Sequence, residues 1–309
     1  MLFYALTISL SAFLLFEVQP VIAKMILPWF GGSSAVWSTC MLFFQLILLL
    51  GYAYAHWLNK LPPRKQAMVH MGLLAVSLAT LPIIPNASWK QSGVEHPSLT
   101  ILALLSVTVG LPYFLLSSTS PLLQAWYART HRGGLPYRLF ALSNFCSMLA
   151  LLTYPFLIEP NLASRSQGMV WSGAFVCFAA LCALTAWRSS AESATPVAAN
   201  AISDEPASES ASEPALATPP TWLDRGLWLG LAAAASILLL AVTNHLTQDV
   251  AAIPFLWILP LAAYLLSFIV CFESPRLYFR PVFVPLAIAS LAFLSYSLWV
   301  DHAYMEHRL

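Results

Sequence analysis

The stretch LFYALTISLSAFLLFEVQPVIAKMILP, from Leu2 to Pro28, decides the class of protein to which this chain belongs. It contains a single acid, Glu17, and a single base, Lys24. A helix that crosses a membrane needs about 20 mainly apolar residues to span a hydrocarbon layer of about 30 Å. This stretch is longer than that, so it predicts a transmembrane helix that is overlong for a straight crossing.

Apolar runs of the same kind recur along the whole chain. They predict about nine spans, at residues 2–28, 35–58, 67–84, 99–127, 138–158, 168–187, 223–246, 251–272 and 281–300. Of the 309 residues, 59% are hydrophobic and 9% are charged, whereas a soluble globular domain carries roughly 25% charged residues. The composition therefore excludes a soluble globular protein and predicts an all-α, polytopic membrane helix bundle whose main partner is the lipid bilayer.

Charge and cysteine content exclude two further classes. The net charge of +1 shows no basic excess, so we expect no nucleic-acid partner. The five cysteines all lie in apolar runs, without a CxxC pair or a histidine at ligand spacing. This pattern is typical of packed thiols, so we predict neither a disulfide framework nor a metal site.

Prolines interrupt the first and fourth runs. Pro20 lies in the first run, and Pro112 and Pro121 lie in the fourth. Proline has no backbone N–H and clashes with the preceding turn, so it kinks or breaks a helix. We therefore expect both spans to be bent, and the first to be a candidate for a discontinuous helix.

Basic residues predict the orientation, because short cytoplasmic loops retain Lys and Arg. With the N-terminus inside, ten fall in cytoplasmic segments: Lys60, Arg64, Lys65, Arg129, Arg132, Arg138, Arg188, Arg225, Arg276 and Arg280. Four fall on the outer side: Lys24, Lys90, Arg165 and Arg308. We therefore predict a bacterial inner (plasma) membrane protein with a cytoplasmic N-terminus and a periplasmic C-terminus.

A change of composition divides the chain. Residues 189–221 are rich in Ala, Ser, Pro and Glu and contain almost no large apolar side chain, which predicts a disordered cytoplasmic linker. The chain is thus predicted to comprise a six-helix membrane unit (1–188), the linker and a three-helix unit (222–309). Six helices followed by a cytoplasmic connection are typical of half of a major-facilitator-type transporter. A second half of three helices means either a different architecture or a truncated chain.

Four stretches carry a resemblance to a known family. They are FEVQPVIAKMILPWFGGSSAVWSTCMLFFQLILLLGYAYAH (16–56), SSTSPLLQAWYART (117–130), SNFCSMLALLTYPFLIEP (143–160) and TNHLTQDVAAIPFLWILPLAAYLLSF (243–268). Together they resemble the membrane-spanning region of bacterial fused membrane and spermidine-synthase-like proteins. Members of that family usually continue into a soluble aminopropyltransferase-like domain with a Rossmann-type fold, so the resemblance implies polyamine chemistry and such a domain or chain as a partner.

That catalytic domain has no counterpart in the sequence. Aminopropyl transfer needs a glycine-rich turn that opens a Rossmann unit, and the chain offers only the isolated pairs Gly31-Gly32 and Gly133-Gly134. We therefore predict no catalytic residue and no cofactor, and we do not expect the chain to be an enzyme by itself.

Charged groups at membrane depth cost at least about 2.5 to 3.5 kcal/mol, so each one is a candidate functional site. Glu17 and Lys24 are seven residues apart and share a face if the helix is continuous. With Gln19 and a helix broken at Pro20, they form a candidate substrate or proton site. The alternative is that Glu17 caps or pairs locally while Lys24 extends to water.

A second candidate lies at the outer end of the seventh span. His245 and Asp249 are four residues apart, so a helix brings them together beside Asn244, where a carboxylate suits an imidazole for proton coupling. The alternative is a polar helix end with Asp249 as a cap. Asn144 belongs to a further polar group, with Ser143 and Ser147, for which interhelical hydrogen bonding is the favoured interpretation and a polar cavity lining the second.

Three functions follow from these observations. The first is a transporter for a small polar or cationic solute. The second is a membrane anchor or partner of a spermidine-synthase-like enzyme. The third is an incomplete remnant of a longer fused protein.

Overall fold

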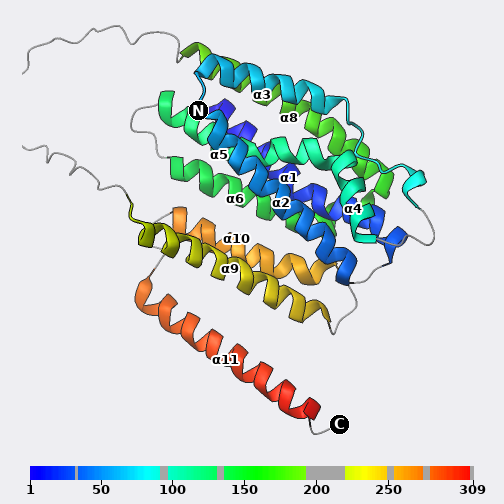
Figure 1. Cartoon of the computed structure of the whole chain (residues 1–309), viewed down its shortest axis with the longest axis vertical. Helices are drawn as coiled ribbons and strands as arrows, with labels where there is room; N and C mark the ends of the chain where they lie inside the picture. The colour runs from blue at the N-terminus through cyan, green and yellow to red at the C-terminus, as the bar shows by residue number, and fades with distance from the viewer. Residues whose placement is uncertain are drawn as a thin grey trace, which may run out of the picture.

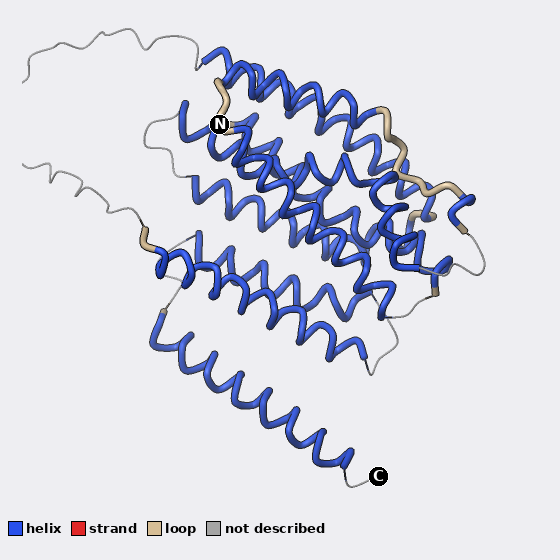
Figure 2. The backbone as a smooth tube through the Cα atoms, in the orientation of Figure 1, coloured by secondary structure: helices blue, strands red, loops and turns tan. Residues whose placement is uncertain are grey.

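The computed structural model describes residues 1–31, 34–90, 97–130, 136–192, 220–248, 254–273 and 279–306. Within these ranges the chain is helical and contains no strand (Figure 2). The prediction of an all-α helix bundle is therefore confirmed.

The first unit contains α1 (Leu2–Phe30), α2 (Ser34–Leu58), α3 (Pro63–Leu78), η1 (Ala87–Trp89), α4 (Pro97–Leu105), η2 (Ser106–Gly110), α5 (Leu111–Thr130), α6 (Pro136–Thr153), η3 (Tyr154–Ile158), α7 (Glu159–Asn161) and α8 (Ser164–Glu192). The second contains α9 (Trp222–Gln248), α10 (Pro254–Glu273) and α11 (Arg280–Glu306). The segments η2 and η3 are π-helical turns that continue α4 into α5 and α6 into α7. The boundaries proposed at 188/189 and 221/222 stay a prediction, because most of the intervening linker lies outside the described residues.

Seven helical stretches in the described part of the chain are long and apolar enough to cross a membrane. Two further predicted spans correspond to shorter helical stretches: α3 has 16 residues, and the apolar part of α10 runs over Ile258–Cys271. The helices of the bundle lie side by side with their axes roughly parallel, whereas α11 runs in a similar direction but lies apart from the others (Figure 1). The helix α1 begins at the end of the structure opposite to the end of α11. This arrangement is that of an integral membrane protein.

The helix α1 lies at the centre of the first unit. It packs against α5, α6 and α8, and more lightly against α2. Around it, α2 packs on α5 and α3 packs on α8. The helix α10 packs on both α6 and α9. The contact between α6 and α10 thus joins the two units.

The expected break at Pro20 is wrong. The helix α1 continues without interruption from Leu2 to Phe30, with both Pro20 and Pro28 inside it. Proline removes one donor from the helix, but a helix buried among neighbours tolerates that loss because surrounding groups supply contacts. In the fourth pass the helical path also continues, and the π-helical turn η2 ends directly before the Leu111–Pro112 pair.

The second unit buries very little of its own surface. The spans Trp222–Thr243 of α9 and Arg280–Ser297 of α11 bury none of their residues inside the protein. Large apolar side chains there are open, for example Ile237 at 65% and Phe293 at 72% exposure. In water such a surface would drive aggregation, whereas lipid chains cover it without cost.

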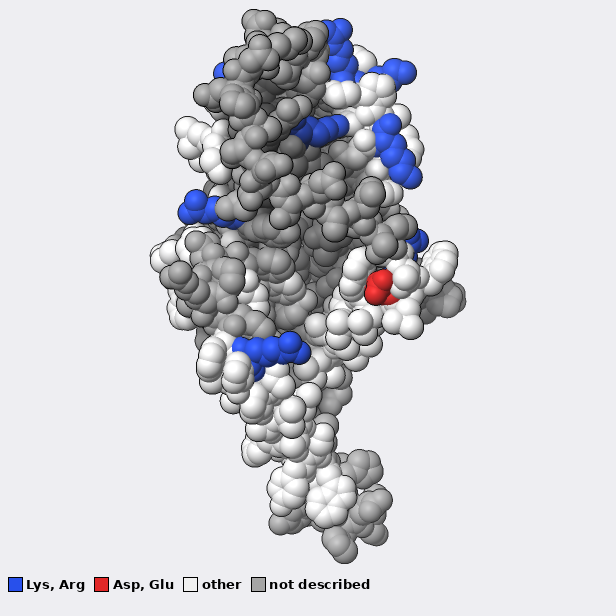
Figure 3. Space-filling model, turned by 90° about the vertical axis from the view of Figure 1, so that its left-hand side faces the viewer, with Lys and Arg blue, Asp and Glu red and all other residues white. Residues whose placement is uncertain are grey.

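Basic side chains gather at the end of the bundle where α1 begins. The described ones at this end are Lys60, Arg64, Lys65, Arg129, Arg138, Arg188, Arg225 and Arg280. Figure 3 looks onto this end and shows, among the described residues, Lys and Arg at several places and little acidic surface. At the opposite end the described basic residues are Lys24, Lys90 and Arg165. The structure thus places basic residues from separate parts of the chain at one end of the bundle, which we call the basic end.

Gly51 permits the close approach of α2 and α5. A Cβ atom at this position would overlap with Oγ of Ser117 and lie 3.1 Å from the carbonyl oxygen of Phe114. Rotation of the Ser117 side chain would relieve the overlap with Oγ, but the tight contact with the carbonyl oxygen would remain, because that atom belongs to the backbone of α5. Gly72 of α3 provides a contrast, because nothing lies within 4 Å of its would-be Cβ.

We predict that Gly51→Ala destabilises the protein by about 1 to 3 kcal/mol through overpacking. Gly72→Ala is the matched control, and it should be neutral or slightly stabilising because alanine favours helix. Thermal unfolding of the two purified variants in detergent measures the difference. Equal unfolding temperatures for both variants would contradict the packing described for α2 and α5.

Candidate functional site

Four buried polar side chains lie along α1: Thr7, Ser11, Glu17 and Gln19. Their positions inside the bundle follow from the central place of α1, since nearly every face of this helix meets another helix. Buried polar groups in a low-dielectric interior are costly unless they are hydrogen-bonded. The partners of these four side chains therefore decide which of them are structural.

Three of the four have partners that tie α1 to its neighbours. The hydroxyl groups of Thr7 and Thr185 are 3.1 Å apart, which links α1 to α8. The hydroxyl of Ser11 donates to the carbonyl oxygen of Leu116 at 3.0 Å. Both bonds bridge helices that are far apart in sequence, so they fix the register of the packing.

Gln19 makes the third link. Its Nε2 donates to the hydroxyl oxygen of Tyr113 at 3.2 Å, and both residues are buried. The Tyr113 ring in turn packs on Phe44, with 4.9 Å between ring centroids. Gln19 was predicted to belong to a substrate or proton site, and the structure places it beside a tyrosine hydroxyl in the interior.

Glu17 is the exception among the four. It is 4% exposed, and in the described part of the protein neither carboxyl oxygen has a hydrogen-bond partner. A carboxyl group in such a place destabilises the folded protein in both protonation states. The ionised group lacks hydrogen-bond donors, and the protonated group lacks an acceptor for its proton. The site therefore offers two unused oxygen atoms to a proton or to a cationic ligand.

Two aromatic side chains hold the backbone of α1 on either side of Glu17. The indole Nε1 of Trp171 donates to the carbonyl oxygen of Leu14 at 3.0 Å. The hydroxyl of Tyr154 donates to the carbonyl oxygen of Pro20 at 3.4 Å. Glu17 is also close enough to Tyr154 to interact with it electrostatically. These aromatic residues come from α8 and η3, and they bond to the backbone of α1 three residues before and three residues after Glu17.

Of the two tyrosines that bond to α1, one lies in a π-helical turn and the other follows such a turn. Tyr154 is the first residue of η3, which contains Pro155, and Tyr113 follows η2 by less than one turn. Single π-helical turns inside α-helices occur frequently at functional sites. Here they shift the helix register at the points where the tyrosines meet α1.

Lys24 does not pair with Glu17. Its Nζ lies 3.0 Å from Oε1 of Glu159, the first residue of α7, in a partly exposed ion pair. Pairs of this exposure contribute about 0 to 1 kcal/mol, so the contact positions two helix ends more than it stabilises them. The pair joins α1 to α7 near the end of the bundle opposite to the basic end.

The other predicted site residues are Asn144 of α6 and the group Asn244, His245 and Asp249 at and beyond the end of α9. Asn144 donates from Nδ2 to the carbonyl oxygen of Phe140 at 2.9 Å, inside its own helix, and Ser147 bonds to Ser143 in the same way. The bonds found for these two side chains are thus local, and the expectation of interhelical bonds stays a prediction. The side chains of Asn244 and His245, and Asp249 as a whole, lie outside the described residues, so that site stays a prediction.

Sequence reasoning missed two buried polar residues on α3. His70 is fully buried, with Nδ1 3.3 Å from the hydroxyl of Tyr54 and Nε2 3.5 Å from Sγ of Cys182. Gln66 lies one turn away and is 1% exposed. A histidine and a glutamine four residues apart inside an apolar segment were the available signal, because that spacing places both on one helix face.

Gln66 is fully satisfied. Its Oε1 accepts from Nε1 of Trp126 and from Nη2 of Arg129, each at 2.8 Å. Its Nε2 donates to the carbonyl oxygens of Leu61 at 2.6 Å and Asn59 at 3.3 Å. This amide therefore serves as a structural link between the α2–α3 connection and α5, in contrast to Glu17.

The described side chains include no cluster of three or more His, Cys, Asp or Glu residues that could hold a metal ion. The chemistry that the site around Glu17 offers is thus proton exchange and hydrogen bonding or charge pairing with a polar or cationic ligand.

Comparison with known proteins adds no family to this description. No family model, no curated protein and no solved structure matches the chain. The functional argument rests on the residues of the chain itself.

We predict that Glu17→Leu stabilises the protein, because it removes a buried carboxyl group that has no partner. The gain expected is about 1 to 3 kcal/mol. Gln19→Leu is the matched control and should have the opposite sign, because it leaves the buried Tyr113 hydroxyl without its donor. Chemical or thermal unfolding in detergent measures both. A destabilised Glu17→Leu variant would mean that the carboxyl group has a structural partner.

Proposed function

We propose that this integral membrane protein is a transporter for a small polar or cationic solute, and that Glu17 binds the solute or a coupled proton. The observation that carries the proposal is the buried carboxyl group of Glu17, whose two oxygen atoms have no hydrogen-bond partner in the described part of the protein. Ionisable groups inside a membrane protein are expensive, and those that persist commonly mark substrate or proton pathways.

The surroundings of Glu17 support the same proposal. Tyr154 offers a hydroxyl group close to Glu17, whereas Gln19 and Tyr113 form a separate polar pair on another face of α1. A carboxylate and a phenol together suit an ammonium group, because they supply charge and an acceptor at once. The resemblance to spermidine-synthase-like proteins makes polyamines the first cationic solutes to test.

The ion pair between Lys24 and Glu159 gives the proposal a second element. It ties α1 to α7 between the Glu17 site and the end of the bundle opposite to the basic end. A half-exposed pair of modest strength can open and close within a transport cycle. In this proposal the pair closes one side of the pathway while the solute is bound.

The alternative function, a membrane anchor for a spermidine-synthase-like enzyme, rests on the sequence resemblance alone. It predicts a soluble aminopropyltransferase-like partner that copurifies with the chain. Transport is preferred because an anchor has no need for a costly buried carboxyl group.

We predict that Glu17→Gln lowers the flux of radiolabelled spermidine into proteoliposomes by at least about tenfold, because the amide can neither carry the charge nor exchange the proton. Asp224→Asn is the matched control, since Asp224 accepts hydrogen bonds from Thr221 at the start of α9, far from Glu17 in the sequence. Spermidine and putrescine uptake is compared at equal protein density. Equal flux in wild type and Glu17→Gln would remove Glu17 from the pathway.

The same proposal includes an orientation, with the basic end and the N-terminus on the cytoplasmic side of a bacterial inner membrane. In a background without the native cysteines, Lys90→Cys should react with a membrane-impermeant maleimide added to intact cells, and Lys60→Cys should react only after lysis. The reverse pattern would invert the orientation.

A further inference from the structure

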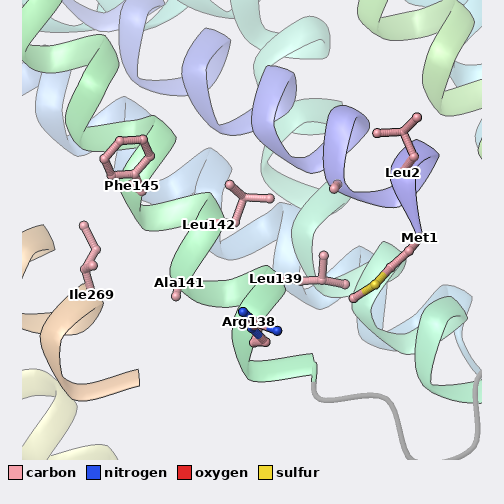
Figure 4. A pocket seen from close by; sticks show the side chains of 9 residues that line it. Met1, Leu2, Arg138, Leu139, Ala141, Leu142, Phe145 and Ile269 are labelled. Carbon is pink, nitrogen blue, oxygen red and sulfur yellow. The ribbon is translucent and has the colours of Figure 1, made fainter. Parts of the chain in front are cut away.

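A pocket of about 600 Å³ lies at the basic end, where the beginning of α1, the beginning of α6 and the end of α10 meet. Its walls are apolar except for one side chain, Arg138. Figure 4 shows Met1 and Leu2 of α1 on one side, Ile269 of α10 on the other, and the side chains of α6 between them. The pocket is separate from the Glu17 site, because Leu2 and Glu17 lie about 22 Å apart along α1.

The pocket has a polar end and an apolar end. Arg138 lies near the start of α6, and Leu142 and Phe145 follow it at spacings of four and three residues. These spacings place the three side chains on one face of the helix, and Phe145 about 10 Å deeper than Arg138 along the axis. The cation thus lies at the membrane surface, and the apolar walls extend toward the membrane centre.

Arg138 is the one charged side chain among the residues that line the pocket. The ion pair found within the described residues joins Lys24 to Glu159, far from this pocket, and no acidic side chain lines the pocket. The neighbouring surface of the basic end carries further Lys and Arg (Figure 3). Such a surface attracts anions and repels cations.

An open, mainly apolar pocket with a cation at its edge matches one kind of molecule in a membrane. A phospholipid presents a phosphate group at the surface and acyl chains below it. A guanidinium group binds phosphate oxygens with two parallel hydrogen bonds, and basic pockets between transmembrane helices bind anionic head groups. A zwitterionic head group fits less well, because its ammonium group meets the same positive field.

We propose that this pocket binds an anionic phospholipid, with the phosphate on Arg138 and an acyl chain between α1, α6 and α10. Since α6 and α10 form the contact between the two helical units, the bound lipid fills a gap in that junction. It would therefore stabilise the docking of the three-helix unit on the six-helix unit.

The test is lipid-dependent thermal unfolding of the full chain in detergent. Titration with phosphatidylglycerol should raise the unfolding temperature of the wild type in a saturable way, and phosphatidylcholine should raise it less. Arg138→Gln should weaken the apparent affinity for phosphatidylglycerol by about fivefold or more, as expected for one lost charge contact. Arg64→Gln, which removes a charge from the same end on α3, should leave that affinity unchanged.

Two further variants keep the test decisive if Arg138→Gln does not fold. Arg138→Lys retains the charge and should retain most of the response. Leu142→Trp retains Arg138 but fills the apolar part, so it should abolish the response, and inorganic phosphate alone should not shift the wild type. An equal response to both lipids, an undiminished response of Arg138→Gln or an undiminished response of Leu142→Trp would overturn the proposal.

Discussion

The enclosure of α1 by α5, α6 and α8 is the constraint on which the rest of the structure depends. A helix surrounded by other helices in a membrane has no water for its polar side chains, so each of them needs a partner from a neighbour. The bonds of Thr7 to Thr185 and of Ser11 to Leu116 meet this need and fix how the neighbours sit. The indole of Trp171 on Leu14 adds a third such link.

Glu17 stands out against this rule, because the same enclosure leaves its carboxyl group without a partner in the described structure. The contrast with Gln66 is informative. Both side chains are buried and polar, but Oε1 and Nε2 of Gln66 each form two hydrogen bonds. This contrast between a fully bonded amide and an unbonded carboxyl group is the basis of the proposal that Glu17 meets a ligand or a proton.

Much of the fold was predictable from sequence because run length alone marks a membrane helix. The first two spans were predicted at 2–28 and 35–58, and the helices run over 2–30 and 34–58. The third was predicted at 67–84 but runs over 63–78, because a proline at its first turn starts the helix among the charged residues Arg64 and Lys65. The length of an apolar run does not show where a helix begins when its first turn is polar.

The site was less predictable than the fold. Counting residues placed Glu17 at membrane depth, but nothing in the sequence indicated that Lys24 pairs with Glu159 or that His70 meets Cys182. Helices that are apolar on all sides have no polar stripe, so periodicity does not tell which face meets which neighbour. Contacts between distant segments therefore came from the structure alone.

The central claim is that Glu17 lies on a solute pathway that opens to water. The most direct test is the reaction of Glu17→Cys, in a background without the native cysteines, with a small cationic methanethiosulfonate reagent in membranes. The account predicts modification that spermidine slows, whereas Ile22→Cys, equally buried on the same helix, should stay unreactive. A Glu17→Cys variant as unreactive as Ile22→Cys would contradict it.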